Sequence, residues 1–191
     1  MKGYIEVYTG DGKGKTTAAI GLAIRAIGAG KKVCIIQFMK SLAYSEQKIL
    51  QTLPGITLIT LGKPYFIAKE GMLTEEEIKA WGSSLKVYPA GHPPKEYRDM
   101  VLKGIDKAVQ AVSGPYDLVI LDEYNMAYWY DLATEEDTKR ILSARKPNVE
   151  LVFTGRNAPK IILDAADLIT EMKKIRHYYD QGVMCRKGIE N

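Results

Sequence analysis

The sequence contains no apolar run near the roughly 20 residues that a helix needs to cross a bilayer. It has only two cysteines, Cys34 and Cys185, which cannot form a tetrahedral metal site by themselves. Cys34 lies inside an apolar run, so we expect a small core residue there. The first expected strand starts almost at the N-terminus and leaves no space for a signal peptide. These absences predict a cytoplasmic protein with no membrane partner.

Strong charge of one sign is missing as well. The formal net charge is +4 over 191 residues, and the basic residues are scattered along helix-like segments. Surfaces that bind nucleic acid usually gather Lys and Arg into a stripe or block, so we expect no nucleic-acid partner. The chain also lacks internal repeats and linkers. We therefore expect residues 1–191 to form a single domain, a length that can bury about 70% of the unfolded surface.

Short apolar runs alternate with helix-like segments along the chain. This alternation predicts an α/β fold, with a mostly parallel sheet and helices on both faces. We expect strands at 3–9, 32–38, 56–61, 117–122 and 149–154, and helices at 15–29, 45–52, 95–112, 134–145 and 159–166. Thr74 and Thr134 each precede acidic residues and are expected to cap a helix.

Two segments depart from this alternation. Residues 62–94 are rich in proline and glycine, and we expect a long excursion there with one short helix near 74–84. Long excursions of this kind often serve as lids or binding loops. From Ile169 onward we expect only a short β-like run followed by a glycine-punctuated tail.

A glycine-rich stretch between the first strand and the first helix carries the strongest functional signal. Strand, glycine-rich turn, Gly-Lys-Thr and helix form the context of a phosphate-binding loop, in which backbone amides surround the phosphates. Lys15 supplies a charge, and the Thr16 hydroxyl can ligate Mg²⁺. The usual spacing places a glycine at position 9, where this chain has Thr9. The candidate nucleotide-binding residues are Gly10, Asp11, Gly12, Lys13, Gly14, Lys15, Thr16 and Thr17.

A second signal lies in an apolar strand that ends in Asp122 and Glu123. We expect this pair at the carboxyl end of a strand neighbouring the first one, where ligands bind in open α/β sheets. A carboxylate there can hold Mg²⁺ directly or through water, so the metal candidates are Thr16, Asp122 and Glu123. The two signals together predict binding of a nucleoside triphosphate with Mg²⁺ or Mn²⁺.

Two further residues could act on the triphosphate. Arg156 follows an apolar strand and could reach the phosphates, or it could be an ordinary surface residue. His177 follows the late β-like run and could act at the site, or it could be a solvent-facing or hydrogen-bonded histidine. The residues alone leave open hydrolysis, phosphoryl transfer or another use of the nucleotide.

The loop at 9–17 resembles the signature of the ATP:corrinoid adenosyltransferases of cobalamin biosynthesis. The resemblance covers most of the chain. Further blocks that are similar to the family are Gln37-Phe38-Met39-Lys40 with Glu46, Leu121-Asp122-Glu123-Tyr124-Asn125-Met126-Ala127, Thr154-Gly155-Arg156, His177 with Gly182, and Gly188-Ile189-Glu190.

The resemblance implies a RecA-like phosphate-loop fold and a transferase reaction. The 5′-deoxyadenosyl group of ATP would pass to the cobalt of a reduced corrinoid, either cob(I)alamin or cob(I)yrinic acid a,c-diamide, with release of triphosphate. Loop amides, Lys15 and Mg²⁺ would then stabilise the departing charge, and Arg156 is the second catalytic candidate. No general base is needed because the nucleophile carries no proton. The resemblance also implies a homodimer and leaves room for a reductase or flavodoxin-like electron donor.

The region expected to contact the corrinoid departs from the family pattern. Family members often carry Gly-x-x-Phe-x-Trp after the third strand, where aromatics are thought to shield the lower face of the cobalt. Here the stretch that begins at Gly62 offers Tyr65 and Phe66 but no tryptophan. The chain also begins without the N-terminal extension that covers the nucleotide in longer members. Tyr65 and Phe66 are therefore candidates for the corrinoid side, although they could instead serve loop packing, and His177 is a further candidate binding residue.

Other functions are compatible with parts of this pattern. A phosphate-loop ATPase or kinase would cleave between phosphates. A nucleotide-dependent binding module would hold corrinoid without turnover. A RecA-like nucleic-acid motor lacks the basic stripe that such a function needs.

Overall fold

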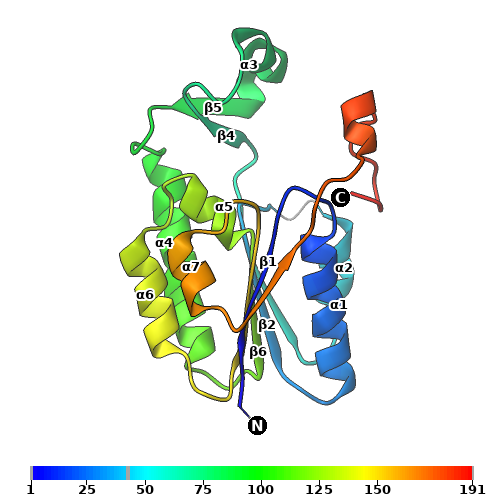
Figure 1. The fold of residues 1–191 in the computed structure, drawn as a ribbon, viewed down its shortest axis with the longest axis vertical. Helices are drawn as coiled ribbons and strands as arrows, with labels where there is room; N and C mark the ends of the chain where they lie inside the picture. Colours follow the sequence, from blue (N-terminus) through cyan, green and yellow to red (C-terminus); the bar gives the residue numbers. More distant parts are fainter. Residues whose placement is uncertain (1, 42–43, 191) are drawn as a thin grey trace.

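The computed structural model describes residues 2–41 and 44–190, and its centre is a six-stranded sheet (Figure 1). The strands are β1 (Ile5–Thr9), β2 (Val33–Phe38), β3 (Ile56–Leu61), β6 (Leu118–Asp122), β7 (Glu150–Thr154) and β8 (Leu168–Glu171). Their order across the sheet is β3-β2-β6-β7-β1-β8, and every neighbouring pair is parallel. The predicted parallel sheet is confirmed. The strand that precedes the glycine-rich loop and the strand that ends in acidic residues are separated by β7.

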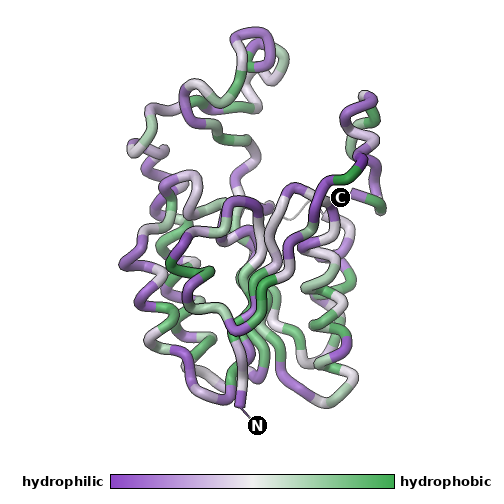
Figure 2. Tube along the Cα trace, in the orientation of Figure 1, coloured by the Kyte–Doolittle hydropathy of each residue, from purple (hydrophilic) through white to green (hydrophobic). Residues whose placement is uncertain are grey.

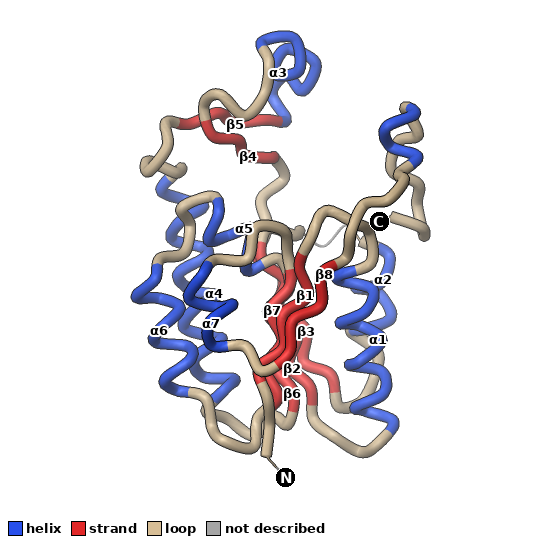
Figure 3. The backbone as a smooth tube through the Cα atoms, in the orientation of Figure 1, coloured by secondary structure: helices blue, strands red, loops and turns tan. Residues whose placement is uncertain are grey.

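Helices cover both faces of this sheet, as Figure 3 shows. One face carries α1 (Lys15–Gly28) and α2 (Ser45–Leu50), and the other carries α4 (Lys95–Val112), α5 (Tyr124–Trp129), α6 (Glu135–Ala144) and α7 (Lys160–Ala165). Five of these helices lie where the sequence predicts them. The sixth, α5, was not predicted, because its six residues follow the acidic strand directly.

The hydrophobic core explains why the central strands read as unbroken apolar runs. Successive side chains of a strand point to opposite faces, and here both faces are covered. Ile36 and Leu121 pack toward α4, whereas Ile35 and Ile120 pack toward α1. Figure 2 shows the apolar strands lying between the helices. Cys34 is buried in this core, as expected, and burial raises the pKa of its thiol to about 12.

The excursion at 62–94 is more regular than the sequence suggests. It contains the predicted helix, α3 (Glu75–Trp81), but also the strands β4 (Phe66–Lys69) and β5 (Leu85–Tyr88), which form a second, two-stranded parallel sheet. This β4–β5 unit stands beyond the carboxyl edge of the main sheet (Figure 1). The Lys69 ammonium lies 3.0 Å from the Asp131 carboxylate, and the Tyr88 hydroxyl donates to the Tyr130 carbonyl at 2.6 Å. These contacts fix the unit to the loop after α5.

The last described segment, residues 172–190, is called here the C-terminal strap. It leaves β8, forms a short 3₁₀ turn at Tyr178–Gln181, and returns toward the loop between β1 and α1 (Figure 1). Within the described part of the chain, no helix has both the length and the apolar character needed to span a membrane.

Candidate active site

The glycine-rich loop connects β1 to α1 at the carboxyl edge of the sheet. Thr9 is the last residue of β1, pairs with Glu171 of β8, and so belongs to the strand. The turn begins at Gly10, with a φ of 94°, and ends at Gly14, with a φ of 118°. Side-chain-bearing residues rarely adopt such angles, so both positions favour glycine. The replacement of the usual first glycine by Thr9 therefore leaves the turn itself intact.

Two loop glycines are required by the protein's own backbone. The Gly12 amide donates to the Met172 carbonyl at 2.6 Å, and a Cβ atom on Gly12 would lie 2.7 Å from that oxygen. A Cβ atom on Gly10 would lie 2.6 Å from the same oxygen. In a phosphate-binding loop, glycines commonly leave room for phosphate oxygens to approach the backbone amides. At Gly10 and Gly12 the room is taken by the C-terminal strap, which passes directly against the loop.

The first turn of α1 carries the two loop residues expected to act on phosphate and metal. The Lys15 ammonium donates to the Gly10 and Gly12 carbonyls, each at 2.7 Å, and so closes the loop on itself. Burial lowers the pKa of Lys15. The Thr16 hydroxyl donates to Asp122 Oδ1 at 2.9 Å, which links α1 to the acidic strand.

The position of Asp122 corrects one expectation. Its strand, β6, is not adjacent to β1, because β7 lies between them. The Thr154 hydroxyl at the end of β7 spans the gap, donating to Asp122 Oδ1 at 2.7 Å. Burial alone would raise the pKa of Asp122, but the attraction of Lys40 and the hydrogen bonds that it accepts from Lys40, Thr154 and Thr16 lower it. Asp122 is therefore an ionised carboxylate with hydrogen-bond donors on both of its oxygens.

Glu123 has the opposite character. It adopts a left-handed backbone conformation, with a φ of 59°, at the start of α5. Non-glycine residues held in this region often mark functional sites. Among the described residues its carboxylate has no hydrogen-bond donor, although its backbone amide donates to the Thr154 hydroxyl at 3.0 Å. Burial, followed by repulsion from Asp122, raises its pKa. Glu123 is therefore an available oxygen ligand that faces the cavity.

Lys40 belongs to this group, although it was not among the predicted site residues. It follows β2 after Met39, which is also left-handed with a φ of 58°. The Lys40 ammonium lies 2.8 Å from Asp122 Oδ2 and 3.1 Å from the Thr16 hydroxyl. A Cβ atom on Gly62 would lie 2.2 Å from the Lys40 carbonyl carbon, so only glycine fits beside this turn. The block at 37–40 resembles the family, but the sequence does not indicate that Lys40 contacts Asp122 and Thr16.

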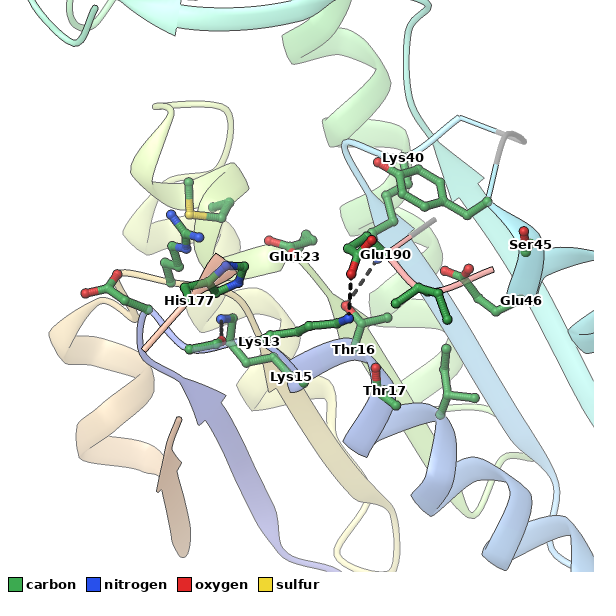
Figure 4. Close-up of a pocket in the computed structure, with 18 of the residues that line it drawn as sticks. Lys13, Lys15, Thr16, Thr17, Lys40, Ser45, Glu46, Glu123, His177 and Glu190 are labelled. Carbon is green, nitrogen blue, oxygen red and sulfur yellow. Dashed lines mark hydrogen bonds and ion pairs between the residues drawn. The ribbon is translucent and has the colours of Figure 1, made fainter. Parts of the chain in front are cut away.

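These residues surround a cavity of about 840 Å³ at the carboxyl edge of the sheet (Figure 4). Arg156 is exposed on its wall, after the end of β7. His177 also lines the cavity. Its Nδ1 atom accepts a hydrogen bond from the Tyr179 amide at 3.1 Å, so His177 is both at the site and hydrogen-bonded. The remaining lining residues are Asp11, Gly12, Lys13, Gly14, Lys15, Thr16, Thr17, Ile20, Lys40, Tyr44, Ser45, Glu46, Glu123, Met126, Gly188, Ile189 and Glu190.

The whole chain, residues 1–191, matches the family model described as ATP:corrinoid adenosyltransferase BtuR/CobO/CobP. The chain belongs to this family. It is an enzyme of the adenosyltransferase class, and the family supports the adenosylation of corrinoids with ATP as the co-substrate.

Curated relatives agree with the family match. The chain is 30% identical over 189 residues to the corrinoid adenosyltransferase CobA of Salmonella typhimurium, covering 99% of this chain and 86% of the relative. It is 32% identical over 196 residues to a corrinoid adenosyltransferase of Sinorhizobium sp, covering 99% and 80%. Among solved structures, it is similar to the KaiC-like protein PH0186 of Pyrococcus horikoshii OT3, with a TM-score of 0.48, 15% identity, and coverage of 99% and 76%.

The oxygen atoms at the cavity suit the hard divalent cation expected of an ATP-using adenosyltransferase. Thr16 and Glu123 line the cavity, and the buried Asp122 carboxylate behind them accepts a hydrogen bond from the Thr16 hydroxyl at 2.9 Å. Within the described residues, no group of three or more His, Cys, Asp or Glu side chains could hold a metal ion. Mg²⁺ is usually held by one or two carboxylates together with phosphate oxygens, so this donor set fits a cation that arrives with a nucleotide.

The two aromatics expected on the corrinoid side do not line this cavity. The Tyr65 hydroxyl donates to Glu96 at 2.8 Å, and the Tyr65 ring packs against Tyr97. These contacts agree with the alternative that Tyr65 serves loop packing. Phe66 is 57% exposed and meets Trp81 edge-on, with ring centroids 4.9 Å apart. Trp81 thus supplies a tryptophan beside Phe66 from a later part of the chain.

Proposed function

We propose that this adenosyltransferase transfers the 5′-deoxyadenosyl group of ATP to the cobalt of a reduced corrinoid and releases inorganic triphosphate. The cobalt(I) electron pair forms the new bond to C5′, the C5′–O5′ bond breaks, and its electron pair leaves with the triphosphate. Cob(I)alamin and cob(I)yrinic acid a,c-diamide are the proposed substrates, in cobalamin biosynthesis or salvage.

The grouping of cations around the phosphate loop is the observation that carries this proposal. Lys13, Lys15, Lys40 and Arg156 all line the one cavity. Preorganised charges stabilise a leaving group that gains negative charge in the transition state. The transfer requires no proton removal, and Glu123 needs no role as a base. Its carboxylate, with the Thr16 hydroxyl and Asp122, would hold Mg²⁺ or Mn²⁺, which would neutralise phosphate charge when bound.

The loop residues bind and orient the nucleotide in this proposal. The Lys15 ammonium donates to the Gly10 and Gly12 carbonyls in this structure. It would turn toward bound phosphates, because a charged oxygen attracts an ammonium more strongly than a carbonyl oxygen does. Arg156 follows the end of β7 and would contact the phosphates as well. No hydrogen bond or ion pair holds its side chain within the described chain, so it need not give up a partner to do so. His177 would close the cavity from the strap side.

The β4–β5 unit is the proposed support for the corrinoid. It stands beyond the carboxyl edge of the sheet, the edge at which the cavity lies (Figure 1). Phe66 and Trp81 there present exposed aromatic surface to a large, flat ligand. We also propose that a reductase or flavodoxin-like donor supplies the cobalt(I) state, and that the enzyme acts as a homodimer.

Product analysis tests the proposed reaction. The protein is incubated with ATP, Mg²⁺ and chemically reduced cobalamin, while the absorbance change of adenosylation is followed and the phosphate products are separated. Adenosylated cobalamin with intact triphosphate is the expected result. ADP and phosphate, with the cobalt left unalkylated, would instead favour a phosphate-loop ATPase or kinase. Tight binding of both substrates without turnover would favour a binding module.

A further inference from the structure

Asp122 has no acceptor position left for a metal-bound water. An ionised carboxylate offers about four lone-pair directions. Oδ1 accepts from the Thr16 and Thr154 hydroxyls at 2.9 and 2.7 Å, and Oδ2 accepts from Gln37 Nε2 and Lys40 Nζ at 3.1 and 2.8 Å. All four directions are used. One of these donors must leave before Asp122 can take part in holding a divalent cation.

Lys40 is the donor that is able to leave. Gln37 and Thr154 are fully buried in adjoining strands, and Gln37 Oε1 is itself held by Gln47 Nε2 at 2.8 Å. Thr16 belongs to the helix that carries the loop. The Lys40 ammonium stands at the end of a long side chain, lines the cavity, and lies above the Tyr44 ring, 5.2 Å from its centroid. Rotation of that side chain would carry the charge into the cavity without moving a strand.

The Lys40 ammonium also occupies the place that a metal ion would need. It touches both Thr16 Oγ1 and Asp122 Oδ2, two of the three oxygen donors assigned to the metal. The lone pair that Thr16 offers to Lys40 is the one it would have to offer to Mg²⁺. Two cations cannot share these oxygens, because each must be close to both.

We propose that Lys40 is a resident cation that excludes divalent metal until nucleotide binds, and that it then swings onto the phosphates. This inference rests on the proposed use of ATP with a divalent cation and goes beyond it by assigning the role of Lys40. Before nucleotide binds, Lys40 keeps Thr16 and Asp122 in position. Afterwards the metal takes over these oxygens and the ammonium adds a charge beside the triphosphate.

Binding of Mn²⁺ to the nucleotide-free protein tests this proposal. Free and bound Mn²⁺ are measured by electron paramagnetic resonance for the wild type, for Lys40→Met, and for Lys48→Met, an exposed lysine of α2 that serves as the matched control. Lys40→Met is expected to bind one Mn²⁺ at least tenfold more tightly than the wild type, and Lys48→Met is expected to match the wild type. A merely structural role for Lys40 would not produce a gain in metal affinity.

Further variants keep the test decisive. Lys40→Ala also removes both the charge and the donor to Asp122 and should show the same gain if Lys40→Met fails to fold, whereas Lys40→Arg keeps a charged donor and should show none. The gain should vanish in Lys40→Met/Asp122→Asn. Equal Mn²⁺ affinity in the wild type and the neutral variants, or a gain that survives loss of the Asp122 charge, would overturn the proposal. The measurement uses neither nucleotide nor corrinoid, so an error in the proposed reaction would leave its outcome unchanged.

Discussion

The Lys13 ammonium in the phosphate loop donates to Glu190 Oε1 at 2.9 Å, which joins two residues 177 positions apart in the sequence. Glu190 also accepts from the Arg186 backbone amide at 2.7 Å and from the Tyr178 hydroxyl. A single carboxylate thus joins the 3₁₀ turn and the last residues of the C-terminal strap and fastens them to the loop. Because phosphate would compete for the charge of Lys13, we expect occupancy of the loop to weaken the contact between Lys13 and Glu190.

Replacing Glu190 should loosen the strap and leave the rest of the fold intact. In Glu190→Gln, Lys13 and Arg186 lose their common anion, and we expect trypsin to cleave the strap about threefold faster or more. The melting temperature should change little, because exposed ion pairs add little to global stability. Glu171→Gln is the control, since its ion pair with Lys173 is long, at 3.8 Å. Equal cleavage of both variants and the wild type would contradict the fastening role.

Removal of the Lys15 ammonium should affect turnover far more than stability. Its charge is held within the loop, at 2.7 Å from two carbonyls, where it can meet the leaving phosphates. Loss of a preorganised charge partner costs on the order of 10²-fold or more in turnover, and we expect this for Lys15→Ala. Adenosylation is followed by absorbance, with Lys48→Ala as the control. Near-normal turnover by Lys15→Ala would show that the triphosphate is stabilised by other groups.

Two glycine substitutions should have opposite effects on stability. In Gly12→Ala the new methyl group would lie 2.7 Å from the Met172 carbonyl oxygen, so the loop and strap must separate. We expect a lower unfolding free energy and weaker ATP binding. In Gly21→Ala, inside α1, nothing lies within 4 Å of the new methyl group, and the unfolding free energy should rise by about 0.5–1 kcal/mol. Urea unfolding measures both effects. A stable, ATP-binding Gly12→Ala variant would be incompatible with the close packing at this position.

The parts of the fold that the sequence predicts are those with a long local pattern. Helix α4 has the bounds expected at 95–112, because its apolar face repeats over five turns, and β3 has those expected at 56–61. Strands β4 and β5 were missed, because four residues are too few to establish an alternation and they pair only with each other. Their segment is also rich in proline and glycine, which favours a loop.

The candidate site divides in the same way. The phosphate loop and the acidic pair are contiguous in the sequence and could be identified there. Lys40 could not, because its contact with Asp122 depends on the left-handed turn at Met39 and on the close approach of Gly62. Glu190 belongs to one of the blocks that resemble the family, but its contact with Lys13 depends on the path of the strap. Such contacts arise from tertiary geometry, for which a local pattern carries no signal.

The raised pKa of Glu123 predicts how its removal changes stability with pH. Burial and Asp122 raise the pKa in the folded protein above the ordinary value of 4.5, so folding binds a proton. The stability that this proton gives is complete below pH 4.5 and is lost as the pH rises through the folded pKa. Glu123→Gln should therefore melt at a higher temperature than the wild type at pH 8, with the difference shrinking toward pH 4.5.

Activity should move in the other direction for the same variant. Loss of an available carboxylate ligand should lower turnover by about 10²-fold, because a neutral amide holds a divalent cation poorly. Thermal melts across pH, together with adenosylation assays, check both parts. Glu136→Gln, an exposed carboxylate in the first turn of α6, is the control. A Glu123→Gln variant that is less stable than the wild type at pH 8 would show that the carboxylate is held by favourable contacts.

Phe66 and Trp81 should determine the apparent affinity for the corrinoid and leave that for ATP unchanged. Their side chains meet at 4.9 Å between centroids yet remain 57% and 45% exposed, so a large flat ligand can bury apolar area on both. Burial of such a side chain is worth about 1.5–3 kcal/mol, and partial coverage should make a tenfold difference in binding. We expect Phe66→Ala and Trp81→Ala each to raise the KM for cobalamin about tenfold, with the KM for ATP unchanged. Val87→Ala, an exposed residue of β5, is the matched control. An equal rise in both KM values would mean that these rings support the fold of the β4–β5 unit, and unchanged values would place the corrinoid elsewhere.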